Sequence, residues 1–180
     1  MTHRVEEFTG ICGNGCLHAY KSWQLGLLTN PAMEDFAISH PHVWRSETPK
    51  ILGDNGIKIG CAELTTIERI EVPEPTTEQC VEFAIRCAWE VCDEPEWRPW
   101  ATAWLDGTDR SEDAGAAWAA RTVAWAAAHA RAARAAVWAA RAARAARAAD
   151  AGADVNAIAV RVMGDADVES AAAAEAERGA

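Results

Sequence analysis

The chain has 180 residues, a formal net charge of −10 and an apolar content of 50%. It contains no uncharged apolar run of about 18 residues, which excludes a membrane-spanning helix. The opening MTHRVEEFTG carries acids where a secretory signal peptide has its apolar segment, so we expect a cytoplasmic protein whose six cysteines are reduced thiols.

Residues 1–75 are expected to form a small β-rich domain. GICGNGCLHAY holds three glycines and an asparagine, which predict a tight turn around residues 13–15. SWQLGLLTN predicts a helix of about two turns that ends before Pro31. HVWRSE, at residues 42–47, alternates in polarity as a strand does.

The strongest turn signal in this part is DNG at residues 54–56. Apolar residues flank it on both sides, so we expect a β-hairpin here. TTIERIEV, at residues 65–72, alternates again and predicts a further strand, which Pro73 ends.

The helical period begins at Thr76. Thr76 and Gln79 fit a capping box, and the apolar residues of CVEFAIRCAWEVC follow at helical spacing. Three cysteines lie in this segment, and their spacing favours core filling over chemistry: they are Cys80, Cys87 and Cys92.

A tryptophan stripe predicts a second helix. Trp97, Trp100 and Trp104 recur at i, i+3 and i+7, and Asp106-Gly107 closes the segment. Because this is the spacing of a buried helix face, we interpret the stripe as core rather than as a ligand cage.

Alanine dominates the chain beyond residue 113, and a long helix is expected there. Asp109 and Glu112 fit its N-terminal cap, and the first glycine after the run is Gly152. A shorter helix is expected over residues 154–163, and residues 166–180 are expected to form a disordered tail. Residues 76–165 thus form a helical region, and the predicted fold class is α+β.

The long helix carries six arginines and no acid between residues 114 and 149, and the segments before and after it have net charges of −11 and −5. Packing on the rest of the chain is the favoured role. Nucleic-acid binding is not expected, because neighbouring carboxylates compete with phosphates for the arginines. Alanine buries little area, which disfavours a membrane surface, and self-association through the alanine stripe stays open.

The tryptophans of this helix lie on two sides of it. At about 100° per residue, Trp118 and Trp125 share one face, and both indoles are expected to be buried. Trp138 lies on the opposite side, among arginines. This side is the candidate interaction surface: Arg131, Arg134, Trp138 and Arg141.

A metal centre is one possible use of the glycine-rich turn. Cys12, Cys16 and His18 have the spacing C-x3-C-x-H and could supply three zinc ligands, with Cys61 or His3 as the fourth. No second closely spaced cysteine pair supports this, so no metal is predicted, and small buried cysteines are the favoured interpretation.

Other chemical signals are weak. His40 and His42 bracket Pro41, a spacing that alone does not establish acid–base chemistry. The sequence has no glycine-rich phosphate loop, HExxH motif or nucleophile elbow. We therefore identify no catalytic residue and expect no cofactor.

Two resemblances bear on function. GCLHAYKS, HVWRSE and GIKIGCAELTTIERIEVP, within residues 11–73, resemble the N-terminal domain of uncharacterised accessory proteins encoded by bacteriophages and their actinobacterial hosts, and the tryptophan-rich and alanine-rich segments are similar to the C-terminal part of the same proteins. This resemblance implies an accessory role. His18 and Lys21, spaced H-x-x-K, are also similar to the first strand of ADP-ribosyltransferase-like folds, although the glutamate and tyrosine motifs of those enzymes are not found here.

The function that we expect is therefore non-catalytic: an accessory protein of phage or host origin that binds another protein. The alternatives are a degenerate ADP-ribosyltransferase-like enzyme that uses His18 and a nearby acid, and a nucleic-acid-binding module. A cleft lined by His18, His42 and an acid would favour the enzyme, whereas an exposed alanine or tryptophan groove would favour the binding protein.

Overall fold

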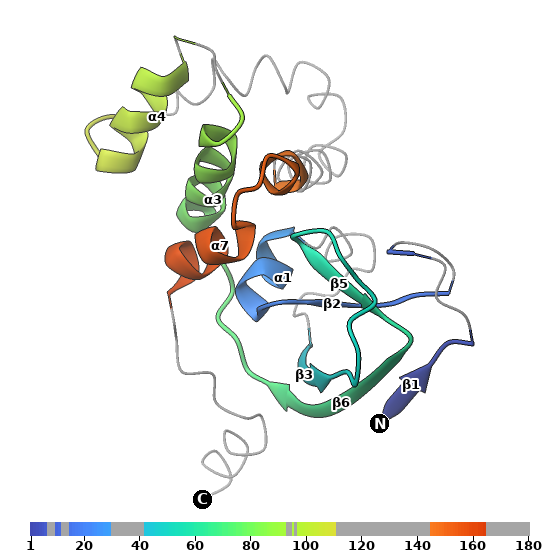
Figure 1. Ribbon diagram of the computed structural model, residues 1–180. Helices are drawn as coiled ribbons and strands as arrows, with labels where there is room; N and C mark the ends of the chain where they lie inside the picture. The colour runs from blue at the N-terminus through green and yellow to red at the C-terminus, as the bar shows by residue number, and fades with distance from the viewer. Residues whose placement is uncertain are drawn as a thin grey trace, which may run out of the picture.

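The computed structural model describes residues 1–6, 10–11, 15–29, 42–92, 95, 97–110 and 145–164. The strands lie mainly in the N-terminal part of the chain and the helices mainly after them, which confirms the predicted α+β class (Figure 1). The strands are β1 (Thr2–Arg4), β2 (Leu17–Tyr20), β3 (Val43–Glu47), β4 (Gly53–Asp54), β5 (Lys58–Cys61) and β6 (Glu63–Ile70). The helices are α1 (Trp23–Thr29), α3 (Thr77–Trp89), α4 (Trp97–Asp106) and α7 (Val155–Met163).

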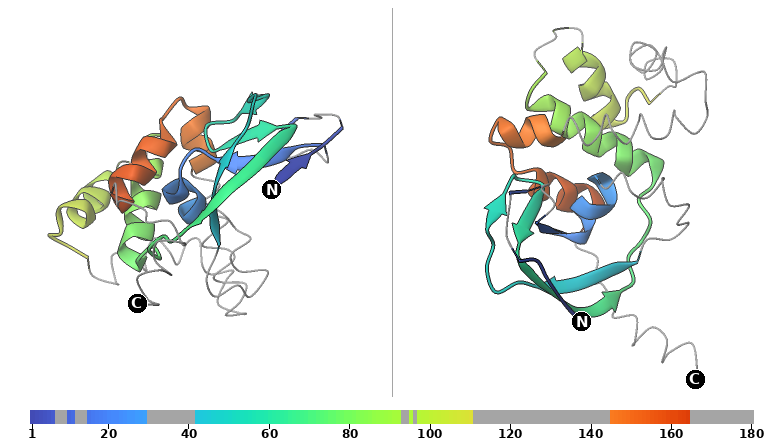
Figure 2. Two further views of the ribbon diagram at one scale, coloured as in Figure 1. Left: turned by 90° about the horizontal axis from the view of Figure 1, so that it is seen from below. Right: turned by 90° about the vertical axis from the view of Figure 1, so that its right-hand side faces the viewer.

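The described strands form two three-stranded antiparallel sheets, in the orders β1-β6-β3 and β2-β5-β4. Only the bend at Ala62 separates β5 from β6, so the chain passes directly from the second sheet into the first. The Ala62 carbonyl accepts a hydrogen bond from the Val5 amide at 2.8 Å, which ties the chain after β1 to this junction. The strands curve around one side of α1, and α7 and α3 lie on its other side (Figure 2).

The hairpin expected at residues 54–56 is confirmed. The Asp54 carboxylate accepts the Gly56 amide at 2.8 Å, and the Asn55 side chain accepts the amides of Ile57 and Lys58. Gly56 has a φ of +82°, a conformation that residues with a β carbon avoid. A β carbon at this position would also lie 2.7 Å from the Ala149 β carbon, so the turn sits directly on the helical residues 145–150.

The main core is built around α1. Leu25 and Leu28 are fully buried, and the helix contacts α7. Two buried polar side chains satisfy their hydrogen bonds: Gln24 donates to the Gly164 carbonyl at 3.0 Å, and Thr29 donates to the Leu25 carbonyl at 2.6 Å. The buried residues of this cluster are Leu25, Leu27, Leu28, Ile57, Phe83, Cys87, Ala145, Ala148, Val155, Ala159, Val162 and Met163.

A second buried cluster joins α3 to α4. The capping box at Thr76 and Gln79 is confirmed, with bonds of 3.1 and 2.9 Å. Trp97 and Trp104 are 2% and 8% exposed, so the tryptophan stripe is core, as its spacing predicts. The three cysteines of this segment also pack against the two clusters, which confirms their core-filling role: Cys80, Cys87 and Cys92.

The helix expected over residues 154–163 is confirmed as α7, whose first turn is capped by the Asp154 carboxylate. Residues 145–150 are helical and are followed by a turn at Gly152, where φ is +87°. The Ala153 amide bonds back to the Ala148 carbonyl and closes this helix end. The described residues include no helix with the length and apolar character needed to cross a bilayer. Trp118, Trp125 and the candidate interaction surface of the long helix (Arg131, Arg134, Trp138 and Arg141) lie outside the described residues.

Candidate functional site

The structure separates most of the residues that the sequence grouped as possible metal ligands. His3 lies on β1 and pairs with Leu64, whereas His18 lies on β2 and pairs with Gly60 in the other sheet. His42 directly precedes β3. In the described part of the chain, no three histidine, cysteine or acidic side chains are grouped so that they could hold a metal. Cys12 and His40 lie outside the described residues.

Cys16 and Cys61 are the exception, because the fold brings them together. The two thiols donate to the same carbonyl oxygen, that of Leu17, at 3.3 and 3.6 Å. Leu17 and Cys61 are directly paired across β2 and β5. The sequence named both cysteines as possible partners in one site, but it could not supply this strand register.

The most exposed apolar side chains of the two sheets lie on β3 and β6, which are neighbouring strands of the β1-β6-β3 sheet. Directly paired residues of an antiparallel ladder share a face, so Trp44 lies on the same face as its partner Arg69. Ile67 lies two residues before Arg69 on β6, at the position that the register with β3 skips. Trp44 is 50% exposed and Ile67 is 43% exposed. We call this surface the Trp44–Ile67 face.

A bulge in β6 interrupts the pairing beside this surface. The register shifts between Arg45 and Ser46, so that Arg45 pairs with Glu68 and Ser46 with Thr66. Ile67 is therefore the extra residue of β6, and it lies between the two paired positions.

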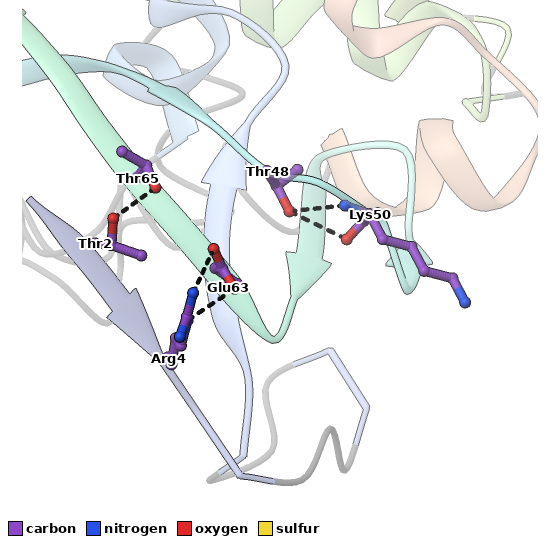
Figure 3. A network of polar contacts seen from close by, with 6 residues as sticks. All are labelled: Thr2, Arg4, Thr48, Lys50, Glu63 and Thr65. Carbon is purple, nitrogen blue, oxygen red and sulfur yellow. Dashed lines mark hydrogen bonds and ion pairs between the residues drawn. The ribbon is translucent and has the colours of Figure 1, made fainter.

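Two polar pairs join β1 to β6 (Figure 3). The hydroxyl groups of Thr2 and Thr65 share a hydrogen bond of 2.9 Å. Arg4 donates to both carboxylate oxygens of Glu63, at 2.8 and 3.3 Å, and this contact raises the pKa of the guanidinium. These pairs hold β1 and β6 in register while leaving their polar groups at the surface. They are therefore the polar contacts of β6 on the side of β1, whereas Trp44 lies on β3 on its other side.

The turn after β3 is fixed by a side chain. The Thr48 hydroxyl donates to the Lys50 carbonyl at 3.1 Å and accepts the Lys50 amide at 3.3 Å (Figure 3). This local bonding turns the chain away from the Trp44–Ile67 face toward β4. The exposed Ile51 follows the turn and lies in neither sheet.

A second polar cluster lies beside the β4–β5 hairpin. Lys21 bonds to the Asp54 carboxylate at 2.8 Å. The lysine and the Gly56 amide together hold the pKa of this carboxyl below its ordinary value. The Lys58 ammonium lies 5.4 Å from the Tyr20 ring centroid, a cation–π contact between directly paired residues. These contacts fix the hairpin against β2, so we interpret the cluster as structural.

The tryptophan cluster of α3 and α4 is covered by its own arginines. The Arg98 guanidinium lies 5.0 Å from the Trp89 ring centroid, and the Arg110 guanidinium lies 4.9 Å from that of Trp104. These cations occupy indole faces that a ligand cage would need to present, which favours the packing interpretation.

Comparison of the chain with protein-family models, curated proteins and solved structures gave no match. The geometry of the described residues therefore selects the candidate site. Sequence reasoning missed the Trp44–Ile67 face, although it predicted both strands. The available signal was the tryptophan in a five-residue strand otherwise rich in polar residues, VWRSE.

Proposed function

We propose that the protein is a non-catalytic accessory protein that binds another protein through the Trp44–Ile67 face. The observation that carries this proposal is a half-exposed tryptophan on β3 and an exposed isoleucine on the neighbouring strand β6. Tryptophan is among the residues that most often dominate the binding energy of protein interfaces, and such residues are commonly surrounded by polar contacts that exclude water.

The ion pairs on the same sheet support this assignment. In the described residues around the patch, Arg4 pairs with Glu63, and Arg69 pairs with Glu71 at 3.3 Å. A protein partner can therefore cover the indole without burying these charges unpaired, which would be costly. The net charge of −10 disfavours a polyanionic partner such as nucleic acid.

The accessory role itself is proposed from the resemblance to phage and actinobacterial proteins, and the cytoplasm is the proposed compartment. The thiols support this compartment, because the described cysteines are thiols rather than disulfides: Cys16, Cys61, Cys80, Cys87 and Cys92.

The test compares a Trp44→Ala/Ile67→Ala variant with an Ile51→Ala variant. Ile51 is 53% exposed, so the control also removes a solvent-facing aliphatic side chain, but from the turn beyond the sheet. Each tagged protein is used to capture partners from a lysate of an actinobacterial host, with and without nuclease. The captured protein is then purified and titrated against each variant.

The expected result is a nuclease-resistant partner that Ile51→Ala retains and the double variant loses. A hot-spot residue contributes about 2 kcal/mol or more, which corresponds to an affinity loss of roughly 30-fold. Equal affinity of the double variant and the control would refute the assignment to this face. Capture that disappears with nuclease would instead support the nucleic-acid-binding alternative.

A further inference from the structure

The backbone of Ser46 in β3 points away from its own sheet. The Thr66 amide donates to the Met1 carbonyl at 2.8 Å, and the Thr66 carbonyl accepts the Met1 ammonium at 3.0 Å. Thr66 therefore directs its backbone groups toward the N-terminal strand, although it is also paired with Ser46 on its other side. Ser46 and Thr66 are thus a pair without mutual hydrogen bonds, so the Ser46 amide and carbonyl point away from β6.

Trp44 has the same backbone direction as Ser46. The backbone groups of successive residues in an antiparallel strand point to opposite sides, so Arg45 bonds toward β6 and Trp44 points outward. Within the described part of the chain, the outward amides and carbonyls of Trp44 and Ser46 have no hydrogen-bond partner, and no strand pairs with this side of β3. An open edge of this kind is a template for pairing with a further strand.

The side chains of β3 are complementary to those of a second β3. Arg45 and Glu47 lie two residues apart, so they share one face of the strand. Arg45 bonds to Glu68 at 2.9 Å, but 60% of its side chain is still exposed. Glu47 is exposed and has no ion pair among the described residues. An antiparallel second copy can bring its arginine to this carboxylate.

A two-fold axis at Ser46 produces this match. It sets Ser46 opposite Ser46 of the second copy, and the two serines exchange their outward amide and carbonyl bonds. Arg45 of each chain then lies opposite Glu47 of the other, at positions where α-carbons are only about 4.5 Å apart. An axis at either neighbouring residue would instead oppose Arg45 to Arg45 or Glu47 to Glu47, and directly opposed like charges are destabilising.

We propose that the protein associates with a second copy of itself by antiparallel pairing of the two β3 strands about Ser46. The two β1-β6-β3 sheets then form one continuous sheet. Arg45 of each chain lies between Glu68 of its own chain and Glu47 of the other. The other outer strand of this sheet, β1, is less suited to pair with itself, because it has three residues and no acid.

This inference does not depend on the proposed protein partner. Trp44 lies on the face of β3 opposite to Arg45 and Glu47, so strand pairing leaves the indole at the surface. The two-fold axis is perpendicular to the joined sheet, so both Trp44 side chains lie on the same face of it. The dimer therefore presents two copies of the Trp44–Ile67 face on one side.

The first experiment measures the molar mass of the purified full chain by light scattering after gel filtration, at increasing protein concentration. Ser46→Pro removes the outward amide without removing a bond to β6, whereas Ser46→Ala keeps this amide and is the matched control. The wild type and Ser46→Ala should change from one chain to two as the concentration rises, and Ser46→Pro should remain a single chain. A wild type that has the mass of one chain at every concentration would overturn the proposal, as would equal dimerisation of Ser46→Pro and Ser46→Ala.

Charge exchange tests the register without a proline. Arg45→Glu opposes two acids across the axis and Glu47→Arg opposes two bases, so each variant alone should dimerise roughly tenfold more weakly than the wild type. An equimolar mixture of the two variants restores both opposite-charge pairs and should dimerise more tightly than either variant alone. A mixture that associates no more tightly than the separate variants would refute pairing about Ser46. Because no other protein is present, these outcomes are separate from those of the partner-capture experiment.

Discussion

Replacement of Gly56 by alanine tests whether the β4–β5 hairpin rests on the helical residues 145–150. Two costs combine at this position. A φ of +82° costs an alanine about 1–2 kcal/mol. The new β carbon would lie 2.7 Å from that of Ala149, an overlap that costs about 1–3 kcal/mol to relieve. We expect a loss of about 2–5 kcal/mol in the free energy of unfolding, or roughly 5–15 °C in Tm.

A matched control separates the two costs. Gly152 has a φ of +87°, but a β carbon there has no neighbouring atom within 4 Å. Gly152→Ala should therefore show only the conformational cost. Addition of Ala149→Gly to Gly56→Ala removes the overlap, and the double variant should recover about 1–3 kcal/mol of coupling energy.

Urea unfolding monitored by tryptophan fluorescence gives each free energy. The glycine at 149 itself costs about 1 kcal/mol in a helix, so the coupling is taken from the complete cycle of single and double variants. Equal losses for Gly56→Ala and Gly152→Ala, with no coupling to position 149, would refute the contact between the hairpin and the helix.

Three further predictions use the same unfolding measurement. Trp97→Ala should cost about 3–5 kcal/mol because its indole is 2% exposed, whereas Trp44→Ala should cost far less; a larger loss at Trp44 would contradict the assignment of core and surface. Thr76→Ala should cost about 1 kcal/mol through loss of the capping box, and an unchanged midpoint would argue against that cap. Asp54 has a folded pKa below its ordinary value because of Lys21, so its stabilising contribution is present above the unfolded pKa and is lost as pH falls through the folded pKa. The stability difference between the wild type and Lys21→Met should therefore shrink on acidification, and a constant difference would contradict this ion pair.

The local elements of the fold were predictable because their signals lie within a few residues. The DNG turn, the capping box of α3, the tryptophan stripe of α4 and the capped α7 are all confirmed. Each depends on turn chemistry or on periodicity within one segment. The strand expected at residues 65–72 forms over Glu63–Ile70 instead. Its first residues pair with β1, and no local signal indicates that partner.

The candidate site depends on strand register, which the sequence leaves open. Isoleucines occupy both faces of β6, so alternation alone could not decide which of Ile67 and Ile70 faces solvent. The extra residue of β6 at Ile67 then shifts the pairing of Ser46 and Glu47 by one residue. The approach of Cys16 to Cys61 has the same origin, because their separation of 45 positions is closed by pairing of β2 with β5.

The burial of α1 by α7 has a consequence for the synthesis of the protein. In the folded protein, α7 packs against three leucines of α1: Leu25, Leu27 and Leu28. These leucines leave the ribosome well before α7, whose last residue is Met163. At about 5–20 residues per second, translation leaves these leucines without their final cover for roughly 10 s. During this interval the nascent chain presents an apolar segment that a chaperone can bind. The packing of α1 against α7 can therefore form only after both helices have been translated. A chain that stops before residue 155 lacks α7, and we expect such a chain to stay bound to chaperones.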